Sequence, residues 1–119
     1  MDEDKLNRLP PDVKKQFLKY ALKLSEKKTK SKVHDDFLAF VKHVWPEFIE
    51  GPHHKKIAEK FNRLAKGEVK RLIINMPPRH TKSEFASFLL PSWMVGRKPD
   101  LKIIQTTHTT ELAIRFGRK

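Results

Sequence analysis

The residue types best suited to chemistry in this chain are the lysine and the hydroxyl at Lys82 and Ser83. They follow a short apolar run at residues 72–74, which is rich in branched side chains and predicts a buried strand. They precede a stretch, from residue 85 onward, whose apolar side chains recur at helical spacing. Strand, tight loop, Lys-Ser and helix is the order of a phosphate-binding loop, where backbone N–H groups and the helix dipole attract an anion. The lysine would contact the outer phosphates of a nucleotide, and the hydroxyl would ligate Mg²⁺.

The loop departs from the pattern G-x-x-x-x-G-K-[ST] at both glycines, because Met76 and Thr81 stand in their places. Pro77 and Pro78 have no N–H, so a phosphate cradle has to come from residues 79–83. If position 81 requires a positive φ, a β-branched side chain is costly there. The pattern alone leaves two interpretations open: a nucleotide site, intact or weakened, and a loop that contains Lys-Ser by chance.

The similarity to a known family is longer than this pattern. Residues 68–84 read Glu-Val-Lys-Arg-Leu-Ile-Ile-Asn-Met-Pro-Pro-Arg-His-Thr-Lys-Ser-Glu, which resembles the altered Walker A region of tailed-phage terminase large subunits. One branch of that family typically has Pro-Pro-Arg-His-Gly-Lys-Ser there. The resemblance extends from about His34 to the end of the chain, through Gly51-Pro-His-His54, Pro91-Ser-Trp93, Lys102-Ile-Ile-Gln-Thr106, Glu111-Leu-Ala113 and Phe116-Gly-Arg118. Terminase large subunits are motors, with an N-terminal ATPase that drives DNA into a procapsid and a C-terminal nuclease that cuts it.

The resemblance implies roles for the loop residues and for one residue upstream. It implies that Lys82 contacts the β- and γ-phosphates, that Ser83 holds Mg²⁺, and that Arg79 stabilises charge on the γ-phosphate or signals the nucleotide state. His54 stands where terminases often carry a Gln that reads the adenine edge, and a histidine also offers one donor and one acceptor. The expected catalytic residues are Lys82 and Arg79, and the expected nucleotide-binding residues are Pro78, Arg79, His80, Thr81, Lys82, Ser83 and His54. The alternatives are that Arg79 and His80 are simply exposed and that His54 is a surface histidine at a helix N-terminus.

The predicted fold class is α/β, with a helical N-terminal region over residues 1–50 and the start of a P-loop ATPase domain over residues 51–119. The first helix is expected to end before the polar stretch at residues 26–32, where Thr29 or Ser31 is suited to cap the next one. Residues 101–107 read as a second strand. Strand, helix, strand and helix then predict the first βαβ unit of a P-loop NTPase parallel sheet, incomplete as it stands.

The acidic residues that phosphoryl transfer also needs are not found in this predicted unit. In the family, a Walker B acid for Mg²⁺ and a carboxylate that orients water follow the second strand by tens of residues, and the acidic cluster of the nuclease lies further on. We therefore expect the chain to be the opening part of a longer ATPase, truncated or split, that binds nucleotide poorly and hydrolyses none by itself.

Composition and charge favour a nucleic-acid partner. The 26 basic and 14 acidic residues give a net charge of +12, which attracts polyanions, although a solvated lysine-rich surface has the same composition. The absence of cysteine excludes a disulfide scaffold and a thiolate metal site. No apolar run approaches the length of a membrane span, and the acidic start is unlike a signal peptide. The expected location is the host bacterial cytoplasm, and transiently the procapsid portal. The implied partners are double-stranded DNA, the portal, the small terminase subunit and further copies in a homo-oligomeric ring, with no membrane.

Two other functions remain open. Another P-loop ATPase or a nucleotide kinase would share the loop and would differ in the acidic motifs that follow it. A small basic DNA-binding module without an enzymatic role would bind DNA in a salt-dependent way that changes in the loop leave untouched.

Overall fold

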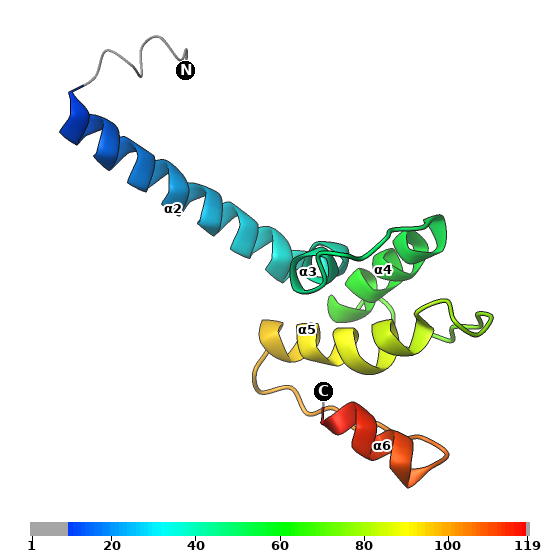
Figure 1. The fold of residues 1–119 in the computed structure, drawn as a ribbon. Coiled ribbons are helices and arrows are strands. Elements are labelled where there is room, and N and C mark those ends of the chain that lie inside the picture. Colours follow the sequence, from blue (N-terminus) through cyan, green and yellow to red (C-terminus); the bar gives the residue numbers. More distant parts are fainter. Residues whose placement is uncertain (1–9, 119) are drawn as a thin grey trace. The chain divides into compact units, whose positions relative to one another are not determined.

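The computed structural model describes residues 10–118, and within these residues all regular structure is helical (Figure 1). The elements in chain order are α2 (Pro11–Asp35), α3 (Phe37–Val44), α4 (Pro52–Ala65), the π-helix η1 (Glu84–Leu89), α5 (Leu90–Arg97) and α6 (Thr110–Gly117). The chain divides into two compact units, one up to Lys32 and one from Val33. The predicted domain boundary between residues 50 and 51 therefore lies inside the second unit, between two helices, α3 and α4, that pack against each other.

Helix α2 runs through the described part of the first unit and buries none of its side chains. The break expected at residues 26–32 is not there, because the helix continues without interruption to Asp35. The Ser25 hydroxyl donates to the carbonyl of Leu22 at 2.8 Å, and the Thr29 hydroxyl donates to the carbonyl of Ser25 at 2.9 Å. These side chains bond back within one helix instead of capping a new one. Of the helices in residues 10–118, not one is both long enough and apolar enough to span a bilayer.

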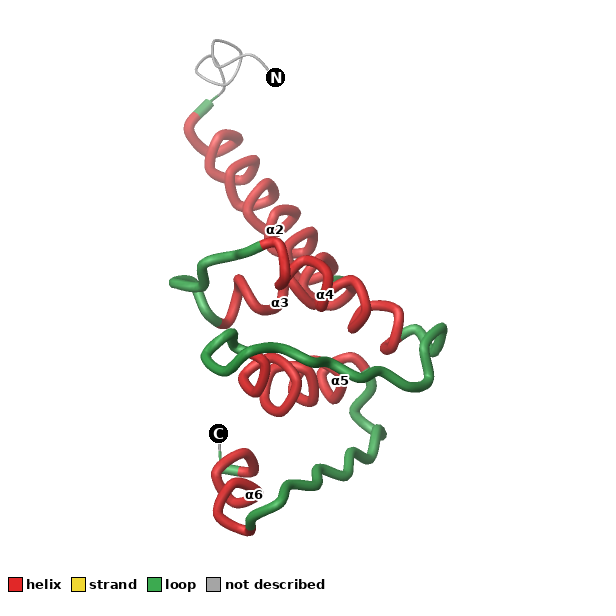
Figure 2. Tube along the Cα trace, turned by 90° about the vertical axis from the view of Figure 1, so that its right-hand side faces the viewer, coloured by secondary structure: helices red, strands yellow, loops and turns green. Residues whose placement is uncertain are grey.

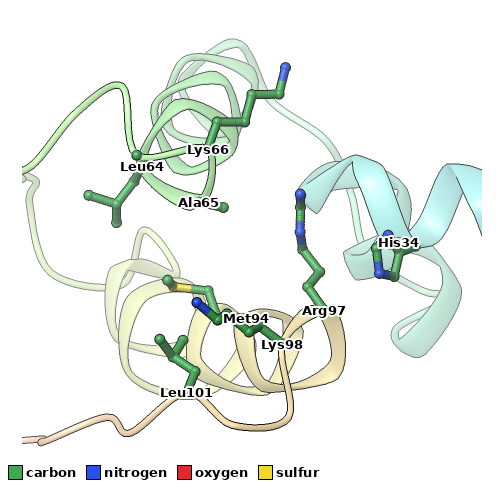
Figure 3. Close-up of a pocket in the computed structure, with 9 residues that line it drawn as sticks. His34, Leu64, Ala65, Lys66, Met94, Arg97, Lys98 and Leu101 are labelled. Carbon is green, nitrogen blue, oxygen red and sulfur yellow. The ribbon is translucent and has the colours of Figure 1, made fainter.

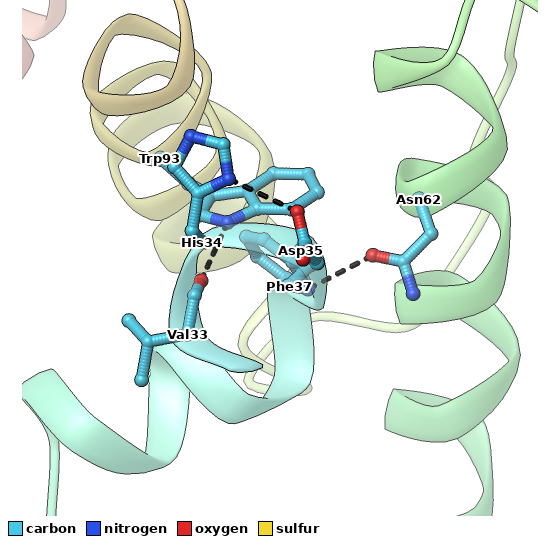
Figure 4. Close-up of polar contacts among 6 residues, drawn as sticks. All are labelled: Val33, His34, Asp35, Phe37, Asn62 and Trp93. Atoms are coloured by element: carbon cyan, nitrogen blue, oxygen red, sulfur yellow. Dashed lines mark hydrogen bonds and ion pairs between the residues drawn. The ribbon is translucent and has the colours of Figure 1, made fainter. Parts of the chain in front are cut away.

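Helix α3 begins at a polar junction with α4. Asp36 is its N-cap, and one carboxylate oxygen accepts a hydrogen bond from the N–H of Ala39 at 3.0 Å. The other oxygen accepts from Nδ2 of Asn62, on α4, at 2.7 Å. Asn62 uses its own Oδ1 to accept a hydrogen bond from the N–H of Phe37 at 2.8 Å (Figure 4). At the start of α3, the N–H of Ala39 is thus satisfied by the N-cap side chain and the N–H of Phe37 by a side chain of the neighbouring helix.

Phe37 lies at the centre of the core of the second unit and has no exposed area. Its ring stands edge-on to the rings of Phe61, Phe85 and Trp93, with centroid separations of 5.0, 5.4 and 5.5 Å. This is a favoured arrangement of aromatic pairs. The indole Nε1 of Trp93 donates to the carbonyl of Val33 at 3.0 Å, so its polar atom is not left unsatisfied (Figure 4). The other buried apolar side chains are Val41, Ala58, Leu89 and Leu90, so α3, α4, η1 and α5 share one core.

The predicted α/β fold, with a βαβ unit of a parallel sheet, is wrong. Residues 10–118 contain no strand, and Figure 2, whose key reserves yellow for strands, draws the segments at residues 71–77 and 101–107 as loops. A strand exists only where a second segment exchanges backbone hydrogen bonds with it. Neither of these segments supplies that partner to the other.

The apolar run before the loop nevertheless has the side-chain period of an extended chain. Leu72 and Ile74 are half-buried against the core, whereas Ile73 between them is 86% exposed. In the second segment Ile104 is 90% exposed. The buried strand predicted for residues 72–74 is therefore wrong, because Ile73 is exposed and the pairing that would make a sheet is missing from the described residues.

Candidate functional site

The loop that leads into η1 has a backbone whose φ changes sign from residue to residue. Arg79 has a φ of 65° and Thr81 a φ of 59°, and the described chain has no other non-glycine residue with positive φ. His80 and Lys82 therefore have negative φ. Alternation of this kind turns successive N–H groups toward one side, and the resulting concavity binds anions. The loop has the alternating φ of such a concavity although it contains no glycine.

The backbone N–H groups of this loop are free to receive a ligand. Residues 78 and 79 form a turn, and among residues 10–118 none accepts a hydrogen bond from the N–H groups of residues 81–83. The backbone bonds of the following helix begin with the N–H of Phe85, which donates to the carbonyl of Thr81 at 2.9 Å. Within the described residues, the N–H groups of Lys82 and Ser83 make no such bond, as is usual in the first turn of a helix. An anion in the concavity would meet several donors at the positive end of the helix dipole.

Lys82 and Ser83 are the first helical residues after the loop and lead directly into η1. Both side chains are exposed, and within the described residues neither has a hydrogen-bond or ion-pair partner. A π-helical turn, as in η1, is rare and is frequently found at functional sites. The Ser83 hydroxyl fits Mg²⁺, which takes few ligands from protein and several from phosphates and water. The Lys82 ammonium fits the outer phosphates.

His54, the third residue of α4, connects this helix to the loop. The N–H of Gly51 donates to Nδ1 of His54 at 2.8 Å. Because a backbone N–H can only donate, Nδ1 carries no proton, and the neutral ring has its proton on Nε2. Nε2 lies 2.8 Å from the Thr81 hydroxyl oxygen, and that hydroxyl donates to the carbonyl of His80 at 2.6 Å. The hydrogen bonds run in one direction, from Gly51 through His54 and Thr81 to His80.

The surroundings of His54 favour its neutral form. The side chain is 6% exposed, and its ring centroid lies 4.7 Å from that of Phe48 and 5.1 Å from that of Phe85. Burial is the main cause that lowers the pKa of His54 below its ordinary value, and the neighbouring His53 lowers it further. Glu50 acts in the opposite direction without reversing the shift. The hydrogen-bond chain therefore keeps its direction at neutral pH.

Two further histidines lie close to His54. The ring centroid of His53 is 3.8 Å from that of His54 and 5.7 Å from that of His80. The imidazole Nδ1 of His80 donates to the carbonyl of Pro78 at 2.9 Å, within the loop. In the described part of the chain, no three His, Cys, Asp or Glu side chains form a group that could hold a metal ion. The contacts of His54 and His80 shape the loop.

The structure brings the predicted nucleotide-binding residues together. Six of them are contiguous from Pro78 to Ser83, and His54, which is 27 positions before Thr81, reaches the loop through the hydroxyl of that residue. Both ring nitrogens of His54 already have partners, so an adenine contact would require one of these bonds to be exchanged. The role of His54 as an adenine contact stays a prediction.

Sequence reasoning missed the part played by Gly51 and by the Thr81 hydroxyl. A Cβ at Gly51 would lie only 2.8 Å from Cε1 of His53, so this glycine allows the close approach. The available signal was the spacing of Gly51, Pro52 and His54. Pro suits the first position of a helix, and an acceptor at the third position is the spacing of a capping box, here with His in place of Glu or Gln.

A separate hollow lies at the other end of α4, where four basic side chains meet an apolar surface (Figure 3). Its basic lining residues are His34, Lys66, Arg97 and Lys98, and its larger apolar ones are Leu64, Met94 and Leu101. The Arg97 guanidinium carbon lies 4.7 Å from the centre of the Trp93 ring. No residue predicted to bind nucleotide lines this hollow, so the loop before η1 remains the stronger candidate site.

Comparisons with known proteins give no relative. No protein-family model matches the chain, and no curated protein and no solved structure is significantly similar to it. The resemblance to terminases therefore depends on the residues quoted above, and function has to be argued from the geometry of the loop.

Proposed function

We propose that residues 78–83 bind the triphosphate of ATP together with Mg²⁺, as the nucleotide site of a motor that moves double-stranded DNA, similar to a terminase large subunit. The observation that carries the proposal is the sign of φ directly before Lys82, which is positive at Arg79, negative at His80 and positive at Thr81. A Lys-Ser pair by itself has little specificity. A Lys-Ser pair at the end of a backbone shaped to bind anions is a far more restrictive combination.

Each loop residue has a distinct role in this proposal. The free N–H groups of residues 81–83 bind phosphate oxygens, and the Lys82 ammonium adds a full charge for the β- and γ-phosphates. Ser83 holds Mg²⁺, which when bound neutralises charge on the phosphates. The exposed guanidinium of Arg79 stabilises charge that develops on the γ-phosphate. The proposal depends on the loop and does not require a sheet.

The test is equilibrium binding of Mg-ATP to the chain, measured by calorimetry for the wild type and for Lys82→Ala. A lost charge-assisted contact is worth about 1.5–3 kcal/mol, so Lys82→Ala should weaken binding about 10- to 100-fold. Lys66→Ala is the matched control, because Lys66 is also exposed and lies at the opposite end of α4 from His54. Equal affinities for the wild type and Lys82→Ala, or no binding by the wild type, would contradict the proposal.

DNA binding through α2 is a second candidate function, supported by a separate observation. Between Pro11 and Asp35, α2 carries eight lysines against three acidic residues, and none of its side chains is buried. A helix of this charge attracts the phosphates of DNA regardless of base sequence. If the protein is part of a packaging motor, α2 would be one of its DNA contacts. If the protein does not bind nucleotide, DNA binding by α2 would be its whole function.

A further inference from the structure

We propose that His54 is a positioning residue, which holds Thr81 in the left-handed conformation where other phosphate-binding loops have glycine. This inference rests on the proposed function, because it explains how the loop keeps its anion-binding form. The contact that supports the inference joins the hydroxyl oxygen of Thr81 to Nε2 of His54 at 2.8 Å.

The conformation of Thr81 requires such support. Its φ of 59° lies in the region that glycine adopts freely and that a β-branched residue strongly disfavours. Without an opposing interaction, the backbone at Thr81 would relax toward negative φ. The alternation that turns the N–H groups toward one side would then be lost.

The hydroxyl of Thr81 is fixed from both sides. It accepts a hydrogen bond from Nε2 of His54 and donates one to the carbonyl of His80 at 2.6 Å. His54 cannot turn away easily, because Gly51 donates to its other nitrogen and its ring packs against Phe85. The chain of hydrogen bonds thus holds the backbone of the loop in a fixed position relative to α4.

The same bonds argue against a direct contact between His54 and the ligand. The side chain is almost fully buried, and both nitrogens are engaged with protein atoms. His54 therefore acts through Thr81, and its effect on binding should be the same for any ligand that carries the phosphate chain. A residue that reads adenine would affect ATP alone.

A matched pair of substitutions separates the two nitrogens of the ring. In His54→Asn, Oδ1 takes the position of Nδ1 and still accepts from Gly51, but nothing reaches Thr81. In His54→Gln, Nε2 takes the position of the ring Nε2 and still donates to Thr81. Both variants lose the ring, so the packing loss is shared. We expect Mg-ATP binding about tenfold weaker for His54→Asn and within about twofold of the wild type for His54→Gln.

A second background tests the coupling to Thr81. With Thr81→Gly the loop adopts positive φ without help, so His54→Asn and His54→Gln should bind Mg-ATP equally well. Inorganic tripolyphosphate serves as a second ligand. If His54 positions the loop, the loss caused by His54→Asn is the same for tripolyphosphate and for ATP.

The outcomes distinguish this inference from the proposed function. If Lys82→Ala weakens binding while His54→Asn and His54→Gln behave alike, the inference fails and the function stands. A loss confined to ATP would make His54 an adenine contact and also overturn the inference. If the wild type binds neither ligand, the proposed function fails, and NMR of the free protein decides the inference. In that experiment the amide signals of residues 79–83 should move in His54→Asn and stay near their wild-type positions in His54→Gln.

Discussion

The side-chain oxygen of Asn62 accepts a hydrogen bond from the backbone N–H of Phe37 at 2.8 Å and so joins α4 to the first residue of α3. The nitrogen of the same amide donates to Asp36 at 2.7 Å. The half-buried side chain of Asn62 therefore bonds both to the N-cap residue of α3 and to the backbone N–H of Phe37, whose ring is fully buried in the core. This junction is specified by hydrogen-bond chemistry and not by apolar area.

Asn62→Ala should lower the free energy of unfolding by about 2 kcal/mol, because a partly buried N–H and a carboxylate each lose a partner. Asn62→Asp keeps an acceptor for Phe37 but sets a second carboxylate against Asp36, so it should also destabilise at neutral pH. Adding Asp36→Asn to Asn62→Asp should restore most of the lost stability, because the donor and the acceptor of the hydrogen bond between these two side chains then change places. Urea unfolding followed by tryptophan fluorescence measures the wild type, these three variants and the single variant Asp36→Asn. Additive losses in the double variant would show that the two side chains do not interact.

Arg79 combines a strained backbone with an exposed charge, and two substitutions separate these properties. Arg79→Gly removes the cost of a φ of 65° and should raise the free energy of unfolding by about 1 kcal/mol relative to Arg79→Ala. Both variants lose the guanidinium, so both should bind Mg-ATP more weakly than the wild type. Thermal unfolding and calorimetry give the two quantities. If the glycine and alanine variants are equally stable, the positive φ at this position is not populated in solution.

The stability of the protein should fall as the pH drops through the folded-state pKa of His54. Burial and His53 hold that pKa below the ordinary value of 6.5, so the unfolded state binds the proton more readily. The contribution of neutral His54 is complete above pH 6.5 and is lost below it. A doubly protonated ring also cannot accept from Gly51.

Unfolding free energies measured between about pH 5 and 8 would reveal this titration. The charged and titratable groups near His54 are His53, His80 and Glu50, with Lys42 and Lys55 paired to Glu50. The hydrogen bond from Lys42 is the main cause that lowers the pKa of Glu50, so Glu50 loses its contribution only at more acidic pH. His54→Gln should remove most of the slope just below pH 6.5. A slope that persists unchanged in His54→Gln would show that His54 does not cause the pH dependence of stability.

The sequence predicts local features of this protein better than its long-range ones. The apolar spacing from residue 85 onward predicts a helix, and the structure has η1 and α5 there, because amphipathic period and burial go together. Polar residues alone do not end a helix, since Thr29 bonds within α2 and the cap of α3 is Asp36. Strand pairing and the contact of His54 with Thr81, 27 positions apart, depend on which segments meet in space. An apolar run or a single histidine in the sequence does not indicate which distant segment it will contact.

DNA binding by α2 should be driven by the release of counterions from the DNA phosphates that its lysines neutralise. Lys19 and Lys23 are four residues apart and therefore lie on one face of the helix. If both contact phosphates, replacing them with Gln should reduce the slope of log affinity against log salt by about 1.8, or 0.9 for each lysine. Replacing Lys66 and Lys98 with Gln, in the second unit, makes the same change in net charge and should leave the slope nearly unchanged. Fluorescence anisotropy of a labelled duplex at several salt concentrations measures these slopes. Equal reductions in both double variants would mean that net charge, and not α2, attracts the DNA.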